Sequence, residues 1–268
     1  MHYQLSENQK EFWKQHGYIV LTDFFPAQVG EDLGTWCNEL TRWPETPGKW
    51  MKYFEKNNLG ERQLCRVENF IDYHKQMDEV ARGARTVQLV TELMGEPATI
   101  FKEKINYKFP NGGGFKPHQD APAFISFNQK FHITMMVAID NCTLENGCLH
   151  VVHGGANKPE ILPQENDGSI STMHAKKLEW TPIECKAGDV ILFDSYLPHY
   201  SEPNRSNGAR RAIFITFNKV SEGGSMRDAY YQDKREKFPP DCERDPHKDY
   251  SEGAAIYNVA NPISANVE

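Results

Sequence analysis

The sequence predicts a mainly β fold with flanking helices, in which helices pack on one face of a β-sandwich or jelly roll. Apolar residues recur at helical spacing through most of residues 1–95, whereas short strand-like segments separated by turn residues begin near residue 98. Helices followed by a run of antiparallel-looking strands are typical of this layered arrangement. No domain boundary is evident. We therefore expect one domain over residues 1–268, with a helical part (1–95), a jelly-roll core (about 98–220) and a C-terminal segment that wraps the surface (221–268).

The first elements have clear local signals. Ser6 to His16 is expected to form a short helix, because Ser6 and Gln9 fit a capping box and Gly17 fits a C-terminal stop. The apolar run Tyr18–Leu21 then predicts a strand.

Two longer helices are expected before the core. The first carries apolar residues at helical spacing: Val29, Leu33, Trp36, Cys37 and Leu40. The second ends at Gly95 and has a similar apolar stripe: Met77, Val80, Ala81, Ala84, Val87, Val90, Leu93 and Met94. Residues 44–62 between them are polar and irregular, so we expect no regular element there.

The core is expected to consist of short strands separated by glycine-rich turns, such as Pro110 to Gly114 and Glu145 to Gly147. The predicted strands are 99–109, 131–139, 147–152, 180–184, 189–194 and 211–219. The last 50 residues are charged and contain proline, so they are expected to lie on the surface and could act as a lid.

Composition excludes several classes of protein. With 39% hydrophobic and 25% charged residues and a net charge of −7, the chain has no basic footprint for nucleic acid. No apolar run approaches the roughly 18 residues of a membrane span. Six dispersed cysteines without a CxxC pair, and no visible signal peptide, favour reduced thiols and a cytoplasmic location. We expect a monomer or a homodimer.

A metal site is predicted from three residues. His118 and Asp120 are two positions apart, so in an extended segment both side chains point to the same side. His199 follows an apolar strand and Pro198, which makes it the best third ligand. Two histidines and one carboxylate with open positions suit Fe(II) in oxygenases. The alternatives are a zinc site that activates water, or a pair of ordinary polar residues.

An anion anchor is expected near this site. Arg210 opens an apolar strand eleven residues after His199, and a guanidinium binds a carboxylate through two parallel hydrogen bonds. It could therefore hold the distal carboxylate of 2-oxoglutarate. The alternative is a surface arginine at a strand entrance, a role that we assign to the neighbouring Arg211.

At this point the sequence resembles the phytanoyl-CoA dioxygenase family of Fe(II)- and 2-oxoglutarate-dependent oxygenases, over roughly residues 10–220. The resemblance rests on several motifs in the same order: Lys104-Ile105-Asn106-Tyr107-Lys108, Pro117-His118-Gln119-Asp120, Thr143-Leu144-Glu145-Asn146-Gly147-Cys148-Leu149, Ala187-Gly188-Asp189 and His199 through Arg210. It implies a double-stranded β-helix (cupin-like jelly roll), an enzyme that uses O2, and iron held by His118, Asp120 and His199. It also implies that Arg210 binds 2-oxoglutarate.

The same resemblance suggests further contacts to 2-oxoglutarate. By position these are Lys104 and Met136, with Asn106, Thr134 and Ser201 as additional candidates on the same inward faces.

The substrate is expected to be a small molecule. The stretch from Phe101 to Lys108 resembles the 2-aminoethylphosphonate dioxygenase branch of the family, which implies phosphonate metabolism and hydroxylation of the carbon next to phosphorus. A phosphonate needs cations in its pocket, for which Lys108, Arg66 and Lys116 are candidates, while His132 could line that pocket. Another small zwitterion, an acid, a natural-product intermediate or a metal-binding jelly roll without turnover remain alternatives.

Overall fold

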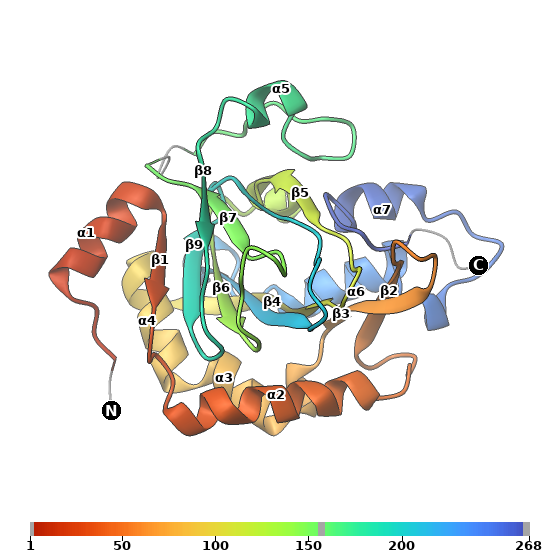
Figure 1. Ribbon diagram of the computed structural model, residues 1–268, viewed down its shortest axis with the longest axis horizontal. Helices are drawn as coiled ribbons and strands as arrows, with labels where there is room; N and C mark the ends of the chain where they lie inside the picture. The colour runs from red at the N-terminus through yellow and green to blue at the C-terminus, as the bar shows by residue number, and fades with distance from the viewer. Residues whose placement is uncertain (1–2, 155–158, 265–268) are drawn as a thin grey trace.

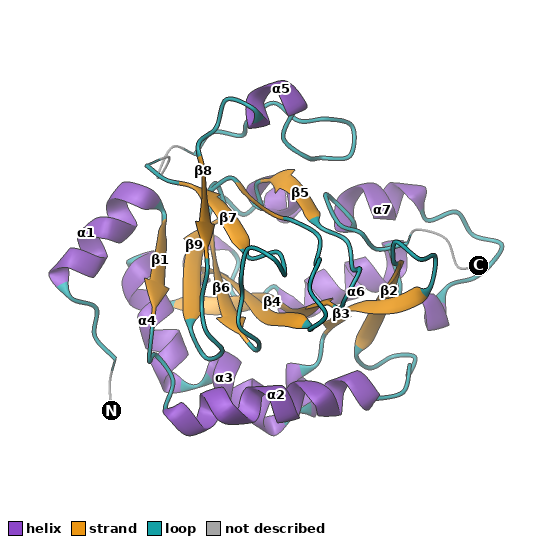
Figure 2. Cartoon of the chain, in the orientation of Figure 1, coloured by secondary structure: helices purple, strands orange, loops and turns teal. Residues whose placement is uncertain are grey.

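The computed structural model describes residues 3–154 and 159–264, and in it two antiparallel sheets face each other (Figures 1 and 2). The larger sheet has seven strands in the order β1 (Tyr18–Leu21), β9 (Val190–Asp194), β6 (His132–Ala138), β11 (Arg210–Lys219), β4 (Ala98–Lys108), β3 (Arg62–Glu68) and β2 (Met51–Lys56). The smaller sheet has four strands in the order β5 (Phe115–His118), β10 (His199–Ser201), β7 (Leu149–Val152) and β8 (Trp180–Ile183).

Helices surround these sheets. The α-helices are α1 (Glu7–His16), α2 (Ala27–Arg42), α3 (Lys75–Arg82), α4 (Ala84–Met94), α5 (Thr172–Ala175), α6 (Arg227–Lys237) and α7 (Ser251–Tyr257). Four short 3-10 helices are η1 (Ile71–Tyr73), η2 (Ala121–Phe127), η3 (Val220–Glu222) and η4 (Asp241–Glu243). Within the described residues, no helix has the length and apolar character needed to cross a membrane.

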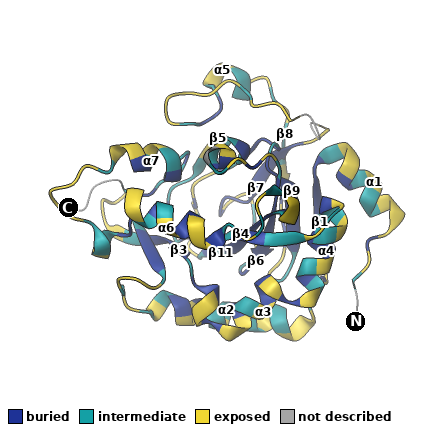
Figure 3. Cartoon of the chain, turned by 180° about the vertical axis from the view of Figure 1, so that it is seen from behind, coloured by how far each residue is buried: buried dark blue, intermediate teal, exposed yellow. Residues whose placement is uncertain are grey.

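Three hydrophobic clusters hold the layers together. The first joins the apolar faces of α1 to α4 to the outer face of the larger sheet, with Leu33, Val80 and Leu89 packed against strand residues such as Ile105 and Ile215. Seen from behind, the outward faces of these helices are exposed whereas the strands are buried (Figure 3). Removing this apolar area from water is the main favourable term for the fold.

The second cluster fills part of the space between the two sheets. Met136, Ile191 and Phe214 of the larger sheet pack there with Leu149 and Val151 of the smaller one. Polar and charged side chains also lie between the two sheets, and together with several aromatic residues they form the candidate site. The β-sandwich predicted from the sequence is therefore confirmed.

The third cluster attaches the C-terminal segment to the edge of the larger sheet. Tyr53 and Phe101 on the strands pack with Tyr230 and Phe238 around α6 and with Tyr257 of α7. The predicted surface wrap thus contains two helices that were not expected from the sequence; its last four residues lie outside the described residues.

Most predicted elements are confirmed, and two predictions were wrong. The helix before Gly17 has its capping box, and the six core strands lie within about two residues of their predicted bounds. Residues 44–62 are not irregular, because β2 and the start of β3 form a hairpin there. The single helix expected near residues 77–94 is two helices, broken at the extended Gly83, where a side chain would lie 2.3 Å from the carbonyl oxygen of Glu79.

Candidate active site

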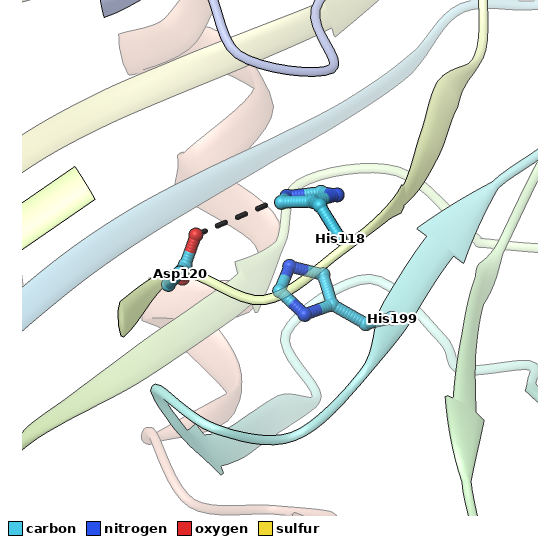
Figure 4. A group of neighbouring side chains, drawn as sticks. All are labelled: His118, Asp120 and His199. Carbon is cyan, nitrogen blue, oxygen red and sulfur yellow. Dashed lines mark ion pairs between the residues drawn. The ribbon is translucent and has the colours of Figure 1, made fainter. Parts of the chain in front are cut away.

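Two short strands of the smaller sheet bring the predicted metal ligands together. His118 ends β5 and His199 opens β10, and the two residues are direct partners across the antiparallel pair. Asp120 lies two residues after the end of β5 and immediately before η2. Figure 4 shows the two imidazole rings side by side, with the Asp120 carboxylate facing them. One ligand atom from each of the three residues lies within 4.8 Å of the others.

Hydrogen bonds fix both imidazoles in the tautomer that a metal ligand needs. Nδ1–H of His118 donates to the carbonyl of Lys116 at 2.7 Å, and Nδ1–H of His199 donates to the carbonyl of Leu197 at 2.9 Å. The lone pair of each Nε2 is therefore free for a metal ion. The turn before His199 is itself held by Asp194, whose Oδ1 accepts from the backbone N–H groups of Tyr196 and Leu197.

Electrostatics favour the same protonation states. Burial, reinforced by the neighbouring His199, lowers the pKa of His118 to about 3. Burial also lowers the pKa of His199. Burial alone would raise the pKa of Asp120, but His199, Lys104 and His118 together bring it below its usual range. Two neutral imidazoles and one carboxylate at neutral pH are the form that binds a divalent ion.

The donor set fits Fe(II). Two histidine nitrogens and one carboxylate oxygen on one side of an ion leave the opposite positions open, and this facial arrangement is typical of non-haem Fe(II) oxygenases. His118 Nε2 and Asp120 Oδ1 are 3.9 Å apart, close enough to share one ion.

The first cavity extends from this triad to Arg210. The space between its lining residues, open solvent at its mouth included, is about 390 Å³. Its lining comes from both sheets: Lys104, Asn106, Phe115, His118, Asp120, Leu149, Phe193, His199, Tyr200, Ser201, Arg210 and Phe214. Arg210 is only 1% exposed, and its Nε and Nη2 have no hydrogen-bond partner among the described residues. A buried guanidinium with unsatisfied donors fits a carboxylate held through two hydrogen bonds.

The second cavity adjoins His118 and Asp120, and the space between its lining residues, open solvent at its mouth included, is about 530 Å³. It shares Lys104, Phe115, His118 and Asp120 with the first cavity. The rest of its lining comes from β3, β4, η2 and the C-terminal segment: Arg66, Lys102, Gln119, Ala123, Tyr230, Ile256, Tyr257, Val259 and Asn261. His118 and Asp120 thus line both cavities whereas His199 lines only the first, and two cavities that meet at the metal ligands suit a reaction between two bound molecules.

The structure brings some of the predicted co-substrate contacts to the first cavity. Lys104, Asn106 and Ser201 line it. Met136 lines neither cavity and is buried in the cluster between the sheets. Thr134 lies behind Asp120, where its hydroxyl donates to Oδ2 at 3.3 Å and contacts the hydroxyl of Thr216 at 3.1 Å.

Of the predicted substrate residues, only some line a cavity. Arg66 lines the second cavity. Lys108 lines neither cavity, because its ammonium donates to Ser201 Oγ at 2.8 Å and to the carbonyl of Gly147 at 3.2 Å. His132 is buried against Phe124 and is absent from both linings.

Sequence reasoning missed three residues that line the second cavity, namely Lys102, Tyr230 and Tyr257. The sequence does carry a signal for Lys102, which is two positions before Lys104 on the same strand and must share its face. Tyr230 and Tyr257 belong to helices that were not predicted.

Replacing Thr134 with valine is expected to weaken Fe(II) binding about 10-fold, because the hydroxyl behind Asp120 is lost while side-chain volume is kept. Partners behind a ligand typically contribute about 10- to 100-fold, and a 3.3 Å hydrogen bond belongs at the low end. The measurement is the Fe(II) concentration that half-saturates activity. Thr86→Val, which removes a buried hydroxyl between α3 and α4, is the matched control. Equal Fe(II) requirements in both variants would contradict this role.

Comparison with known proteins agrees with the geometry. Residues 13–212 match the phytanoyl-CoA dioxygenase (PhyH) family. The chain is 52% identical to a 2-aminoethylphosphonate dioxygenase from an uncultured bacterium, over 96% of this chain and 98% of the relative. It is 37% identical to a methylphosphonate hydroxylase from Gimesia maris, over 89% of this chain and 90% of the relative.

Solved structures share the fold. EctD from S. alaskensis, crystallised with 2-oxoglutarate and 5-hydroxyectoine, superposes with a TM-score of 0.68 over 81% of this chain and 77% of that chain, at 22% identity. This likeness confirms the predicted jelly-roll core. The chain belongs to the phytanoyl-CoA dioxygenase family of Fe(II)- and 2-oxoglutarate-dependent oxygenases.

Proposed function

We propose that this enzyme hydroxylates 2-aminoethylphosphonate at the carbon next to phosphorus. The balanced reaction consumes O2 and 2-oxoglutarate and releases succinate and CO2 with the hydroxylated product. The observation that carries the proposal is the 52% identity, over nearly the full length of both chains, to a 2-aminoethylphosphonate dioxygenase. The second cavity supports it, because three cationic side chains line that cavity beside the triad.

In this proposal each group of residues has one task. His118, Asp120 and His199 hold the Fe(II), which together with 2-oxoglutarate supplies the oxidation of a C–H bond by O2. Arg210, which lines the first cavity with two unpartnered donors, binds the distal carboxylate of 2-oxoglutarate. The substrate occupies the second cavity. The protein thus holds both molecules at the metal and keeps the site largely free of bulk water.

The test measures succinate and hydroxylated product with Fe(II), ascorbate, 2-oxoglutarate and O2. We expect 2-aminoethylphosphonate to stimulate succinate release and to be converted in a one-to-one ratio, with the new hydroxyl at the carbon bonded to phosphorus. Taurine, which has the same chain but a sulfonate group, is the control for the headgroup. Absence of a hydroxylated phosphonate product would overturn this proposal.

Methylphosphonate is the second candidate substrate, because the chain is also 37% identical to a methylphosphonate hydroxylase. The same assay distinguishes the two. A higher kcat/KM for methylphosphonate than for 2-aminoethylphosphonate would transfer the assignment to it.

A further inference from the structure

Two ammonium groups on β4 face the site. Lys102 and Lys104 share the inward face of that strand and both line the second cavity. Neither ammonium has a hydrogen-bond or ion-pair partner among the described residues, and the negative charges that act on them come from Asp120 and Glu68. The ammonium nitrogen of Lys102 lies over two aromatic rings, 4.6 Å from the centre of the Phe124 ring and 5.4 Å from the centre of the Tyr230 ring. Cation–π contacts hold an ammonium in place but leave its charge uncompensated.

Such an arrangement is unfavourable without an anion. Burial lowers the pKa of Lys102, and burial with the nearby Arg66 and Lys102 lowers that of Lys104 well below its usual range. Half-buried cations that have no partner cost stability, and a negatively charged ligand recovers this cost when it binds. The two lysines therefore indicate that an anion occupies the second cavity during the reaction.

The inward residues of β4 run in order from one cavity to the other. Lys102 lines only the second cavity, Lys104 lines both, and Asn106 lines only the first. Lys108 comes next and is the direct partner of Arg210 on β11. The six residue-to-residue steps from Lys102 to Lys108 span about 20 Å of extended chain. The ammonium of Lys102 thus belongs to the chamber remote from the proposed 2-oxoglutarate anchor, so its anion is the substrate.

Arg66 provides a second, fixed cation in the same chamber. Its Nε donates to Asn106 at 3.0 Å, Nη1 donates to Glu68 at 3.4 Å and Nη2 donates to Asn261 of the C-terminal segment. The charge of Glu68 is shared with Lys234, which is 2.7 Å away, so Arg66 is oriented without being fully neutralised. These contacts use three of its five N–H groups.

The formal charges in this chamber match a doubly negative headgroup. Its cations are Arg66, Lys102 and Lys104, and its only carboxylate among the described lining residues is Asp120, a proposed iron ligand. We propose that Lys102, together with Arg66, binds the phosphonate oxygens of the substrate and selects for that headgroup. This inference rests on the proposed function, whose substrates are small phosphonates.

The test compares Lys102→Met, which keeps side-chain length but removes the charge, with Lys102→Arg. We expect the KM for 2-aminoethylphosphonate to rise about 10- to 100-fold in Lys102→Met, which corresponds to the loss of a hydrogen bond to a charged group. Lys102→Arg should recover part of this loss. The KM for 2-oxoglutarate and the Fe(II) requirement should stay unchanged. Lys10→Met, which removes a surface lysine paired with Glu7 and Glu92, is the matched control.

A second readout separates headgroup recognition from a purely structural role. Methylphosphonate has the headgroup but no amine, so its affinity as substrate or competitor should fall by the same factor in Lys102→Met. The inference is overturned if the KM is unchanged, if the loss is confined to 2-aminoethylphosphonate, or if methylphosphonate does not compete with the wild type. Thermal unfolding checks that both variants are folded.

Failure of the proposed function would give a different result. In that case the wild type would not hydroxylate either phosphonate. Calorimetric titration of the anaerobic enzyme, loaded with Fe(II) and 2-oxoglutarate, with methylphosphonate then still tests the anion site. Binding that is lost in Lys102→Met supports the site, and equal or absent binding in both proteins refutes it.

Discussion

Replacing Asp120, His118 or His199 with alanine is expected to abolish Fe(II) binding and turnover. Each substitution removes one of the three atoms that lie within 4.8 Å of one another and leaves an incomplete ligand set. Loss of a partner behind a ligand typically costs about 10- to 100-fold, so we expect loss of a ligand itself to cost at least about 100-fold in metal affinity. The measurement is bound iron per chain after anaerobic dialysis, together with succinate release at saturating 2-oxoglutarate.

The control for this experiment is Asp228→Ala, which removes a carboxylate whose side chain is 99% exposed on α6. It should retain iron and activity. A variant of the triad that binds iron with wild-type affinity would exclude that residue as a ligand. Full iron binding with no activity would instead assign it a role in the reaction.

Replacing Arg210 with alanine is expected to raise the KM for 2-oxoglutarate about 30-fold or more. Removing one member of a buried, hydrogen-bonded charge pair typically costs about 2–5 kcal/mol, and each 1.4 kcal/mol is about tenfold in affinity. Arg210 is buried, and its Nε and Nη2 have no hydrogen-bond partner among the described residues. The KM of Arg210→Lys for 2-oxoglutarate should lie between those of the wild type and Arg210→Ala, because a lysine keeps the charge but cannot form two parallel hydrogen bonds to a carboxylate. Steady-state kinetics with varied 2-oxoglutarate measure the effect.

Arg211→Ala is the matched control, since Arg211 is the next residue on β11 but points to the opposite face. Its guanidinium binds the carboxylate of Asp140 through Nε and Nη2, both at 2.8 Å. This variant should lose stability while its KM for 2-oxoglutarate stays unchanged. Equal changes in KM for the two variants would show that Arg210 has no specific role as an anchor.

The part of the site that the sequence could predict depends on local spacing and on motif order. His118 and Asp120 are two positions apart, and that spacing alone places them together. The pairing of β5 with β10, which brings His199 opposite His118, was not predictable from periodicity. These strands have four and three residues, and such short segments give almost no alternating apolar pattern.

The hairpin β2–β3 was missed because it buries polar and charged residues among its apolar ones. Lys52, Glu55, Arg66 and Glu68 are each less than 9% exposed, and they are stabilised by ion pairs and hydrogen bonds instead of apolar contacts. A search for alternating apolar residues therefore does not detect these strands. These polar residues include Arg66, which lines the second cavity.

The C-terminal helix α6 was missed for a related reason. It is rich in charged residues, yet Arg227 and Lys234 are buried, since each is paired with a buried glutamate: Arg227 with Glu103 at 2.7 Å and Lys234 with Glu68 at 2.7 Å. The partners that allow these two cations to be buried lie on β4 and β3, far from the helix in sequence, so the helix sequence alone does not reveal that its charged residues are buried. Tyr230 of this helix reaches the second cavity as a consequence.

An anaerobic crystal structure with Fe(II) and 2-oxoglutarate tests the central claim most directly. We expect one iron bound by Nε2 of His118, a carboxylate oxygen of Asp120 and Nε2 of His199, with the distal carboxylate of 2-oxoglutarate on the guanidinium of Arg210. Iron bound elsewhere, or 2-oxoglutarate lying among Arg66 and Lys102 in the second cavity, would contradict the assignment of the two chambers.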